Sequence, residues 1–309
     1  MAVYLTEEDV EALLAIGDAL EAVEGSFLRQ AEGRIENKPR YRLGLDGGSV
    51  AVMAASDHGL GVAGVKTYAA GRNGASFVVI LFDAASQETL ALIEGDHLGR
   101  LRTGAASGVA AKYLAKDGAR SLGVFGCGWQ AETQIEAIRV AVPTIDRVAV
   151  YCRTAERRRD FARRMDAEPV DNPSQAAAAD VVVTITTSKD PVLRGEWLSP
   201  GALVVAAGAN HPSRRELDNA VLERAAFVCC DSKEDAMIES GDLIEPASQG
   251  VLDWLEVHEL AEVVSGQVQG RQAPDDIVVF KSNGIAAWDV AVGAAAVVRA
   301  REQGLGRDL

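Results

Sequence analysis

The spacing of apolar and polar residues changes along the chain and predicts different elements in turn. After an acidic segment at 6–9 that is close to a capping box, Val10, Leu13 and Leu14 follow the spacing of an amphipathic helix. A second helix is expected over 19–30. The stretches that follow are short, β-branched or alternating, and Gly, Asp and Asn interrupt them, which is typical of strands. We expect these strands over 41–54, 61–66, 76–82 and 89–94.

From residue 120 onward the pattern becomes one of strands alternating with longer segments. A helix rich in small residues is expected over 103–116, with Asp117-Gly118 ending it. Nearly continuous apolar segments then predict buried strands over 121–126, 147–152, 180–186, 202–208, 227–230 and 276–282. Buried strands separated by helices are typical of an α/β protein with a doubly wound parallel sheet. A last helix over 286–303 follows that sheet, and we expect it to pack on the amino-terminal part.

The composition is typical of a globular protein, and the net charge limits the classes of binding partner that we expect. Apolar residues make up 48% and charged residues 25% of the 309 residues, which argues against long disordered segments. The formal net charge is −14, which disfavours a basic surface of the kind that binds polyanions. Neither nucleic acid nor an anionic membrane is therefore an expected partner. Apolar runs fall short of the roughly 18 residues of a membrane span, and the amino terminus lacks a signal-peptide pattern. With four cysteines interpreted as reduced, we expect a cytoplasmic protein.

A glycine-rich turn follows the first strand of the expected parallel sheet: Gly126-Cys127-Gly128-Trp129-Gln130-Ala131. In such turns the first glycine permits the tight bend, the second lets the backbone approach a pyrophosphate, and the helix that follows supplies free N–H groups. Ala131 stands where a third glycine is usual, and it is an accepted small-residue variant. Because the strand before and the helix after both agree, we predict dinucleotide binding in preference to an incidental turn.

The end of the second strand bears on the choice of cofactor. Sites for NAD place an acidic residue there, whereas NADP sites use arginine for the 2′-phosphate. This chain has Arg153 and Thr154, with Arg157 one helical turn on, and the acidic residue is missing from that place. We therefore predict NADP(H) in preference to NAD(H), the alternative being a solvated basic helix start. The remaining expected cofactor contacts follow later strands: Thr186, Gly208 and Ser282.

Four segments together resemble the ornithine cyclodeaminase/mu-crystallin family: LIEGDHLGRLRTGAASGVAAKYL (92–114), VFGCGWQAE, VVAAGANHPSRRELD and IVVFKSNGIAAWD. The resemblance implies a mixed α/β domain for substrate binding and dimerisation, made from 1–118 and 286–309. A Rossmann-type dinucleotide-binding domain at 119–285 is inserted into it. It also implies a homodimer, with the strand-rich residues 41–94 as the expected interface, and hydride transfer between nicotinamide and the α-carbon of an amino acid.

The resemblance assigns roles to basic residues that the pattern alone would leave as surface cations. Arg40 matches the family's substrate-carboxylate arginine, with Arg42 as a competitor two residues on. Arg102 matches the second carboxylate or cofactor arginine, and Thr103 is expected near the pyrophosphate. Lys66 matches the active-site lysine. Two guanidiniums suit a carboxylate, and a lysine with a lowered pKa suits proton transfer to an imine.

Two departures from the family's pattern reduce the number of activities that we expect. Asn210 stands where cyclodeaminases and archaeal alanine dehydrogenase carry an aspartate, and Ala51 stands where cyclodeaminases carry a glutamate. An amide orients a nitrogen or a water but does not take a proton. We therefore predict an NAD(P)H-dependent reductase of a 2-imino acid, or the reverse dehydrogenase, with Asn210 at the substrate. The alternatives are an ornithine cyclodeaminase using bound NAD and a non-catalytic NADPH-dependent binding protein.

Other polar residues are candidates to replace the missing aspartate. His211 is the nearest, although an exposed loop histidine is an equally good interpretation. We interpret Asp231, Glu239 and Asp242 as a solvated acidic segment. The four histidines have no ligand spacing, so a metal site is not expected, and Cys127 is interpreted as a packing residue.

Overall fold

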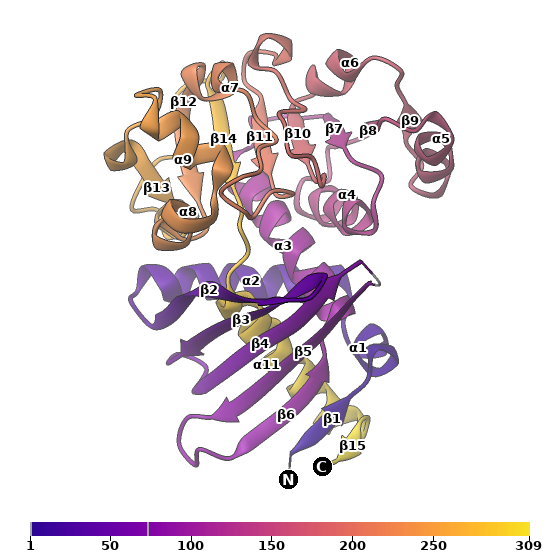
Figure 1. Cartoon of the computed structure of the whole chain (residues 1–309), viewed down its shortest axis with the longest axis vertical. Helices are drawn as coiled ribbons and strands as arrows, with labels where there is room; N and C mark the ends of the chain where they lie inside the picture. Colours follow the sequence, from indigo (N-terminus) through magenta and orange to yellow (C-terminus); the bar gives the residue numbers. More distant parts are fainter. Residues whose placement is uncertain (1, 73) are drawn as a thin grey trace. The chain divides into compact units, whose positions relative to one another are not determined.

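The computed structural model describes residues 2–72 and 74–309, which form two compact units (Figure 1). The amino-terminal unit contains the chain up to Arg102 together with Ile285–Leu309, and the inserted unit contains Thr103–Gly284. The first boundary falls inside helix α3 (Asp96–Leu114), earlier than the position after residue 118 that the sequence suggested. One continuous helix therefore carries Arg102 in one unit and Thr103 in the other.

The amino-terminal unit is built on a seven-stranded sheet in the order β15-β1-β6-β5-β4-β3-β2. Its strands are β1 (Val3–Leu5), β2 (Ile35–Leu45), β3 (Gly48–Asp57), β4 (Val62–Gly71), β5 (Gly74–Asp83), β6 (Thr89–Glu94) and β15 (Arg307–Asp308). The expectation of one strand over 41–54 was wrong, because Gly47 adopts a φ of +88° and the chain reverses there into a β2–β3 hairpin. The short strands β1 and β15 were not expected.

Helices cover one face of this sheet. They are α1 (Glu7–Leu13), which the side chain of Thr6 caps, α2 (Ile16–Ala31) and α11 (Ala286–Gln303). α11 lies against β3, β4, β5 and α2, as Figure 1 shows. The row of paired residues Met53, Lys66, Val79 and Ile93 is buried on one face. The adjacent row on the opposite face is only half-buried, and it consists of Ala54, Val65, Ile80 and Leu92.

The inserted unit confirms the predicted doubly wound parallel sheet. The strand order is β13-β12-β14-β11-β10-β7-β8-β9, and every pairing is parallel. The expected strands are β7 (Ser121–Phe125), β8 (Arg147–Tyr151), β10 (Val181–Thr184), β11 (Leu203–Ala206), β12 (Ala225–Cys230) and β14 (Ile277–Lys281). Two short edge strands were not expected: β9 (Glu168–Pro169) and β13 (Val257–Glu259).

The helices of the inserted unit connect these strands. The α-helices are α4 (Trp129–Ala141), α5 (Ala155–Arg164), α6 (Pro173–Ala177), α7 (Asn219–Glu223), α8 (Lys233–Glu239), α9 (Gly241–Ser248) and α10 (Leu260–Val264), with 3₁₀ turns at Gly195–Trp197 and Trp254–Glu256. From β7 the chain proceeds through β8 to β9 on one side, and then returns to β10 on the other side of β7. Ligands of doubly wound sheets bind at the carboxyl ends of the strands where the order reverses in this way.

Among the helices of residues 2–72 and 74–309, none combines the length and apolar character that crossing a membrane requires.

Candidate functional site

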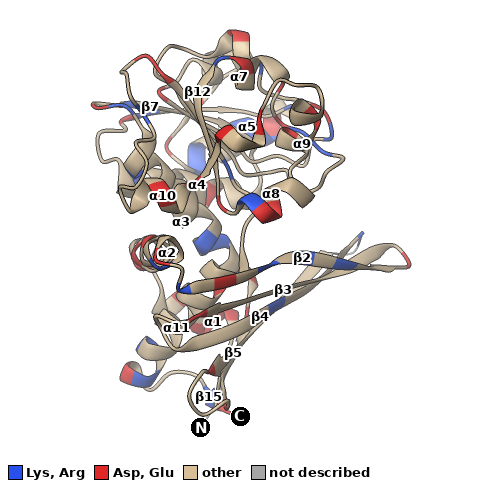
Figure 2. Cartoon of the chain, turned by 90° about the vertical axis from the view of Figure 1, so that its left-hand side faces the viewer, with Lys and Arg blue, Asp and Glu red and all other residues tan. Residues whose placement is uncertain are grey.

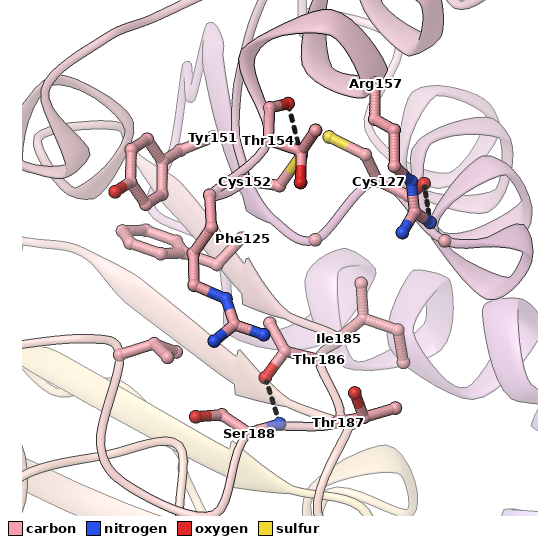
Figure 3. A pocket seen from close by; sticks show the side chains of 14 residues that line it. Phe125, Cys127, Tyr151, Cys152, Thr154, Arg157, Ile185, Thr186, Thr187 and Ser188 are labelled. Carbon is pink, nitrogen blue, oxygen red and sulfur yellow. Dashed lines mark hydrogen bonds between the residues drawn. The ribbon is translucent and has the colours of Figure 1, made fainter.

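A pocket of about 220 Å³ opens where the strand order of the inserted unit reverses (Figure 3). The carboxyl ends of β7 and β8 and the segment after β10 line it. Its walls are Phe125, Gly126, Cys127, Gly128, Tyr151, Cys152, Arg153, Thr154, Arg157, Ile185, Thr186, Thr187, Ser188 and Val192. Of the residues predicted to contact a cofactor, six therefore line this pocket together: Gly126, Gly128, Arg153, Thr154, Arg157 and Thr186.

The two glycines of the turn are needed for different structural reasons. Gly126 has a φ of +126°, and a Cβ there would lie 2.4 Å from the carbonyl oxygen of Ile185. Gly128 precedes α4 as its N-cap, and a Cβ there would meet no atom within 4 Å. The first glycine is thus required by the fold, while the second leaves open space at the amino-terminal end of α4, where the helix dipole favours an anion. Trp129 and Gln130 begin this helix, and Ala131 is fully buried beneath it.

The rim of the pocket is basic. Arg153 and Arg157 are exposed, and Arg157 donates a hydrogen bond to the carbonyl oxygen of Cys127 over 3.5 Å. Among the described residues that line the pocket, none is acidic. Burial and the neighbouring Cys152 thiol raise the pKa of Cys127, so this thiol is not activated as a nucleophile. Cys127 is half-buried and lines the pocket.

Glu216 organises the loops beside this pocket. Its carboxylate accepts hydrogen bonds from the backbone N–H groups of Thr186 (2.6 Å) and Gly208 (2.8 Å) and from the hydroxyl of Thr184 (3.0 Å). The side chain is fully buried, and this burial raises the pKa of Glu216. Two predicted cofactor residues, Thr186 and Gly208, are therefore held by one carboxylate that the sequence analysis did not single out.

The interpretation of Asp231, Glu239 and Asp242 as a solvated acidic segment was wrong. Their exposed fractions are 0%, 2% and 0%. Asp242 forms an ion pair with the fully buried Lys281 (3.0 Å). Asp231 accepts hydrogen bonds from the backbone N–H groups of residues 283 and 284 and from the hydroxyl of Ser282 (3.2 Å). The partners of these carboxylates come from distant parts of the chain, so the local polar pattern gave no sign of their burial.

The segment after β11 carries the amide that was predicted to replace the family's aspartate. Asn210 is half-buried in the inserted unit, and the carbonyl oxygen of the preceding Ala209 accepts a hydrogen bond from Lys281 (2.5 Å). His211 is exposed, and its Nδ1 lies 2.8 Å from the hydroxyl of Ser213. An exposed histidine is a weak substitute for a buried carboxylate.

In the amino-terminal unit, two predicted basic residues contact one carboxylate, and a third, Arg40, acts electrostatically on the lysine of the pair. Lys66 on β4, Arg40 on β2 and Arg102 on α3 are 3%, 7% and 7% exposed. Asp289, in the first turn of α11, lies 2.7 Å from the Lys66 Nζ and 3.3 Å from the Arg102 Nε. The Arg102 guanidinium also stacks 5.8 Å from the ring centre of Trp288. We call Arg40, Lys66, Arg102 and Asp289 the charged cluster.

The lysine of the charged cluster is electrostatically unusual. Burial lowers the pKa of Lys66 to about 8, and Arg102 and Arg40 act in the same direction while Asp289 opposes them. A lysine in this range exchanges a proton near neutral pH, which an ordinary surface lysine does not. Arg40 contributes to this field and is buried, whereas the competing Arg42 is only half-buried, so the structure favours Arg40.

Asp289 is the member of the cluster that sequence reasoning missed. It lies in the segment IVVFKSNGIAAWD, which carried the resemblance, but no role was attached to it. A buried acidic residue in an otherwise small and apolar helix was the signal available. Among the described residues, no group of three or more His, Cys, Asp or Glu side chains is arranged to hold a metal ion.

A family model matches nearly the whole chain. The model that describes the ornithine cyclodeaminase/mu-crystallin family aligns with residues 2–304. The chain belongs to this family. The resemblance seen in the sequence motifs is thereby confirmed, and the same motifs lie at the phosphate turn, along α3 and at the start of α11 in this member of the ornithine cyclodeaminase/mu-crystallin family.

Individual relatives match over most of their length. The alanine dehydrogenase of Archaeoglobus fulgidus is 34% identical over 314 residues, covering 98% of this chain and 96% of that protein. The Δ(1)-pyrroline-2-carboxylate reductase of Bacillus cereus is 37% identical over 273 residues, covering 84% and 83%. Among solved structures, the Δ(1)-pyrroline-2-carboxylate reductase of Thermococcus litoralis, in complex with NADH and L-proline, superposes with a TM-score of 0.95 at 30% identity and covers 99% of this chain and 100% of that chain.

Proposed function

We propose that this chain is an NAD(P)H-dependent oxidoreductase that reduces a 2-imino acid to an L-amino acid or catalyses the reverse oxidation. The observation that carries the proposal is the charged cluster, in which Arg40, Lys66 and Arg102 are all buried and the pKa of Lys66 is lowered to about 8. The alanine dehydrogenase and pyrroline-carboxylate reductase relatives support this reaction class.

In such a reaction, the residues of the charged cluster would have different roles. Arg40 and Arg102 are fixed, permanently charged donors that bind the substrate carboxylate. Lys66 in its ammonium form donates a proton to the imine nitrogen, and in its amine form it accepts one from the substrate ammonium. The nicotinamide cofactor supplies the hydride for the imine carbon. In this assignment the amino-terminal unit binds substrate.

The inserted unit is assigned to the cofactor. Its pocket fits a dinucleotide because the glycine turn leaves open space at Gly128, at the amino-terminal end of α4, where the helix dipole favours a pyrophosphate. Thr186, Gly208 and Ser282 lie at the carboxyl ends of the sheet, where such cofactors bind. We further propose a preference for NADP(H), since Arg153 and Arg157 line a pocket without a carboxylate for a ribose 2′-OH.

The test is consumption of NADPH, beside NADH, with Δ(1)-pyrroline-2-carboxylate and with pyruvate, glyoxylate or oxaloacetate in concentrated ammonia or methylamine. We expect turnover with at least one substrate, and a kcat/KM at least about tenfold higher with NADPH, a preference of about 1.4 kcal/mol. A faster reaction with NADH would overturn the cofactor preference alone. Ammonia release from ornithine without imine reduction would restore the cyclodeaminase, and NADPH binding without any turnover would indicate a binding protein.

We also propose a homodimer that uses the half-buried face of the amino-terminal sheet. The row Ala54, Val65, Ile80 and Leu92 is apolar across four strands. Charged residues gather on β2 and are sparse along β3, β4 and β5 (Figure 2). An apolar sheet face that helices leave uncovered is suited to pairing with a second copy.

Ile80→Asp is expected to convert the dimer into a monomer, because it places a charge at the centre of the apolar row. Sedimentation equilibrium measures this as a fall from twice the chain mass to 32.6 kDa. Val140→Asp is the matched control, since Val140 is an exposed apolar residue of α4 in the inserted unit. A wild-type protein that sediments as a monomer contradicts the proposal.

A further inference from the structure

Asp289 differs from the other buried carboxylate of the amino-terminal unit in how it is satisfied. Asp57 accepts hydrogen bonds from the Nε of Arg29 (2.7 Å) and from the backbone N–H groups of Gly59 and Leu60 (3.0 Å each), as expected of a structural anchor. The Oδ1 of Asp289 instead accepts one hydrogen bond, from the Lys66 Nζ at 2.7 Å, and forms an ion pair with the Arg102 Nε at 3.3 Å. Its Oδ2 is buried and has no hydrogen-bond partner within residues 2–72 and 74–309.

A buried carboxylate with one oxygen unsatisfied costs stability, so its retention calls for another reason. The surroundings supply one. Lys66 lies among two buried guanidiniums, and it packs on the sheet between Met53 and Val79, which offer no charge. Desolvation and like charge both favour the neutral amine at such a place. Without a buried negative charge, the cluster would lose the proton that the reaction needs.

We infer that Asp289 is a positioning residue that keeps Lys66 protonated and fixes the direction of its ammonium group for proton transfer to the substrate nitrogen. This inference rests on the proposed function of Lys66. Asp289 occupies one of the three N–H donors of the ammonium and leaves the others for a substrate. The contact is anchored from both sides, by β4 and by the first turn of the 18-residue helix α11, so the ammonium has one orientation.

Other charges around Lys66 do not take this role. Asp96, in the first turn of α3, also interacts electrostatically with Lys66, and burial and Glu7 raise the pKa of Asp96. Arg40 and Arg102 lower the pKa of Lys66. On α3, Gly99 faces the lysine, and a Cβ there would lie 2.7 Å from the Nζ. Asp289 is thus the carboxylate in direct contact with the lysine.

The test is the pH dependence of Asp289→Asn. Imine reduction needs the ammonium form of Lys66, so its rate falls as the pH rises through the lysine pKa, which is about 8 in the wild type. Amino-acid oxidation needs the amine form, so its rate rises through the same pKa. Removing the negative charge is expected to move both limbs of the pH profile, the fall in reduction and the rise in oxidation, to lower pH by at least about one unit, with reduction at pH 8 at least about fivefold slower.

Two further variants separate this role from a loss of structure. Asp57→Asn also removes one buried, paired carboxylate of the amino-terminal unit, and it is expected to lower the melting temperature without moving either limb. Asp289→Glu keeps the charge and is expected to return the limbs toward their wild-type positions. If Asp289→Asn lowers the rate equally at every pH, the inference is overturned.

A measurement independent of turnover makes the two proposals distinguishable. The rate at which cyanate carbamylates Lys66, followed by peptide mass spectrometry in the cofactor-free protein, reports the amine fraction directly. We expect its midpoint to be at least about one pH unit lower in Asp289→Asn than in wild type. If that shift is found in a protein that reduces no imine, only the proposed function fails. If imine reduction is found and the midpoint is unchanged, only the inference about Asp289 fails.

Discussion

Lys66→Met is expected to slow imine reduction by about 100- to 10,000-fold, the range over which a positioned general acid contributes. Methionine fills a similar buried volume but has no proton to donate, and it leaves in place the two arginines that we propose as ligands of the substrate carboxylate. The loss is therefore expected in kcat, while the dissociation constant for NADPH, measured by fluorescence titration, stays within about threefold because the cofactor pocket is formed by the other unit.

Two further variants serve as controls for Lys66→Met. Lys66→Arg keeps a positive charge beside Asp289 but does not release its proton, so it is expected to be nearly as slow as Lys66→Met. Lys116→Met removes another lysine–aspartate pair, the one with Asp180 at 2.7 Å in the inserted unit, and is expected to leave the rate unchanged. If Lys66→Met kept more than about a third of the wild-type kcat, Lys66 would not be the proton donor.

Asp242→Ala is expected to lower the free energy of unfolding by about 3–5 kcal/mol, the cost of leaving a buried charge without its partner. Lys281 is fully buried and pairs with Asp242 at 3.0 Å. The other carboxylate oxygen accepts hydrogen bonds from the backbone N–H groups of Glu216 (2.7 Å) and Leu217 (2.9 Å). Because Glu216 in turn holds the loops at Thr186 and Gly208, weaker cofactor binding is expected to accompany the loss of stability.

Urea unfolding measures this effect, with Glu245→Ala as the control. Glu245 lies on the same helix α9 and pairs with Arg215 at 3.1 Å, but it is half exposed, so its loss is expected to change the stability little. The double variant Asp242→Asn with Lys281→Met is expected to recover part of the loss, since it removes both buried charges together. A midpoint for Asp242→Ala equal to that of the control would show that the pair is not a structural anchor.

The phosphate turn is a feature that the local sequence was sufficient to predict. A glycine at 126, a glycine at 128 and a small residue at 131 between a strand and a helix were enough to predict the turn, because each requirement concerns the backbone of the same few residues. The parallel sheet was predicted for a similar reason. The central strands β7, β10, β11 and β14 are buried on both faces, so each appears in the sequence as a continuous apolar run.

The gathering of Arg40, Lys66 and Arg102 could be anticipated only through the family resemblance. These residues lie on β2, β4 and α3, and nothing in the local pattern around any of them distinguishes a buried cation from a surface one. Their partner Asp289 lies 223 residues from Lys66 in sequence, and no motif role pointed to it. The same limit explains the error at Asp231, Glu239 and Asp242, whose polar neighbours along the chain suggested solvent.

The amino-acid sequence by itself therefore determined most of the long strands, the class of the inserted sheet and the place of the phosphate turn, because these depend on apolar periodicity and on backbone freedom within short segments. The tertiary structure alone decided which charges are buried and paired: Lys66 with Asp289, and Lys281 with Asp242. The pKa of a side chain depends on the dielectric and on the charges that surround it in space, and for these residues the surroundings come from segments far apart in the chain.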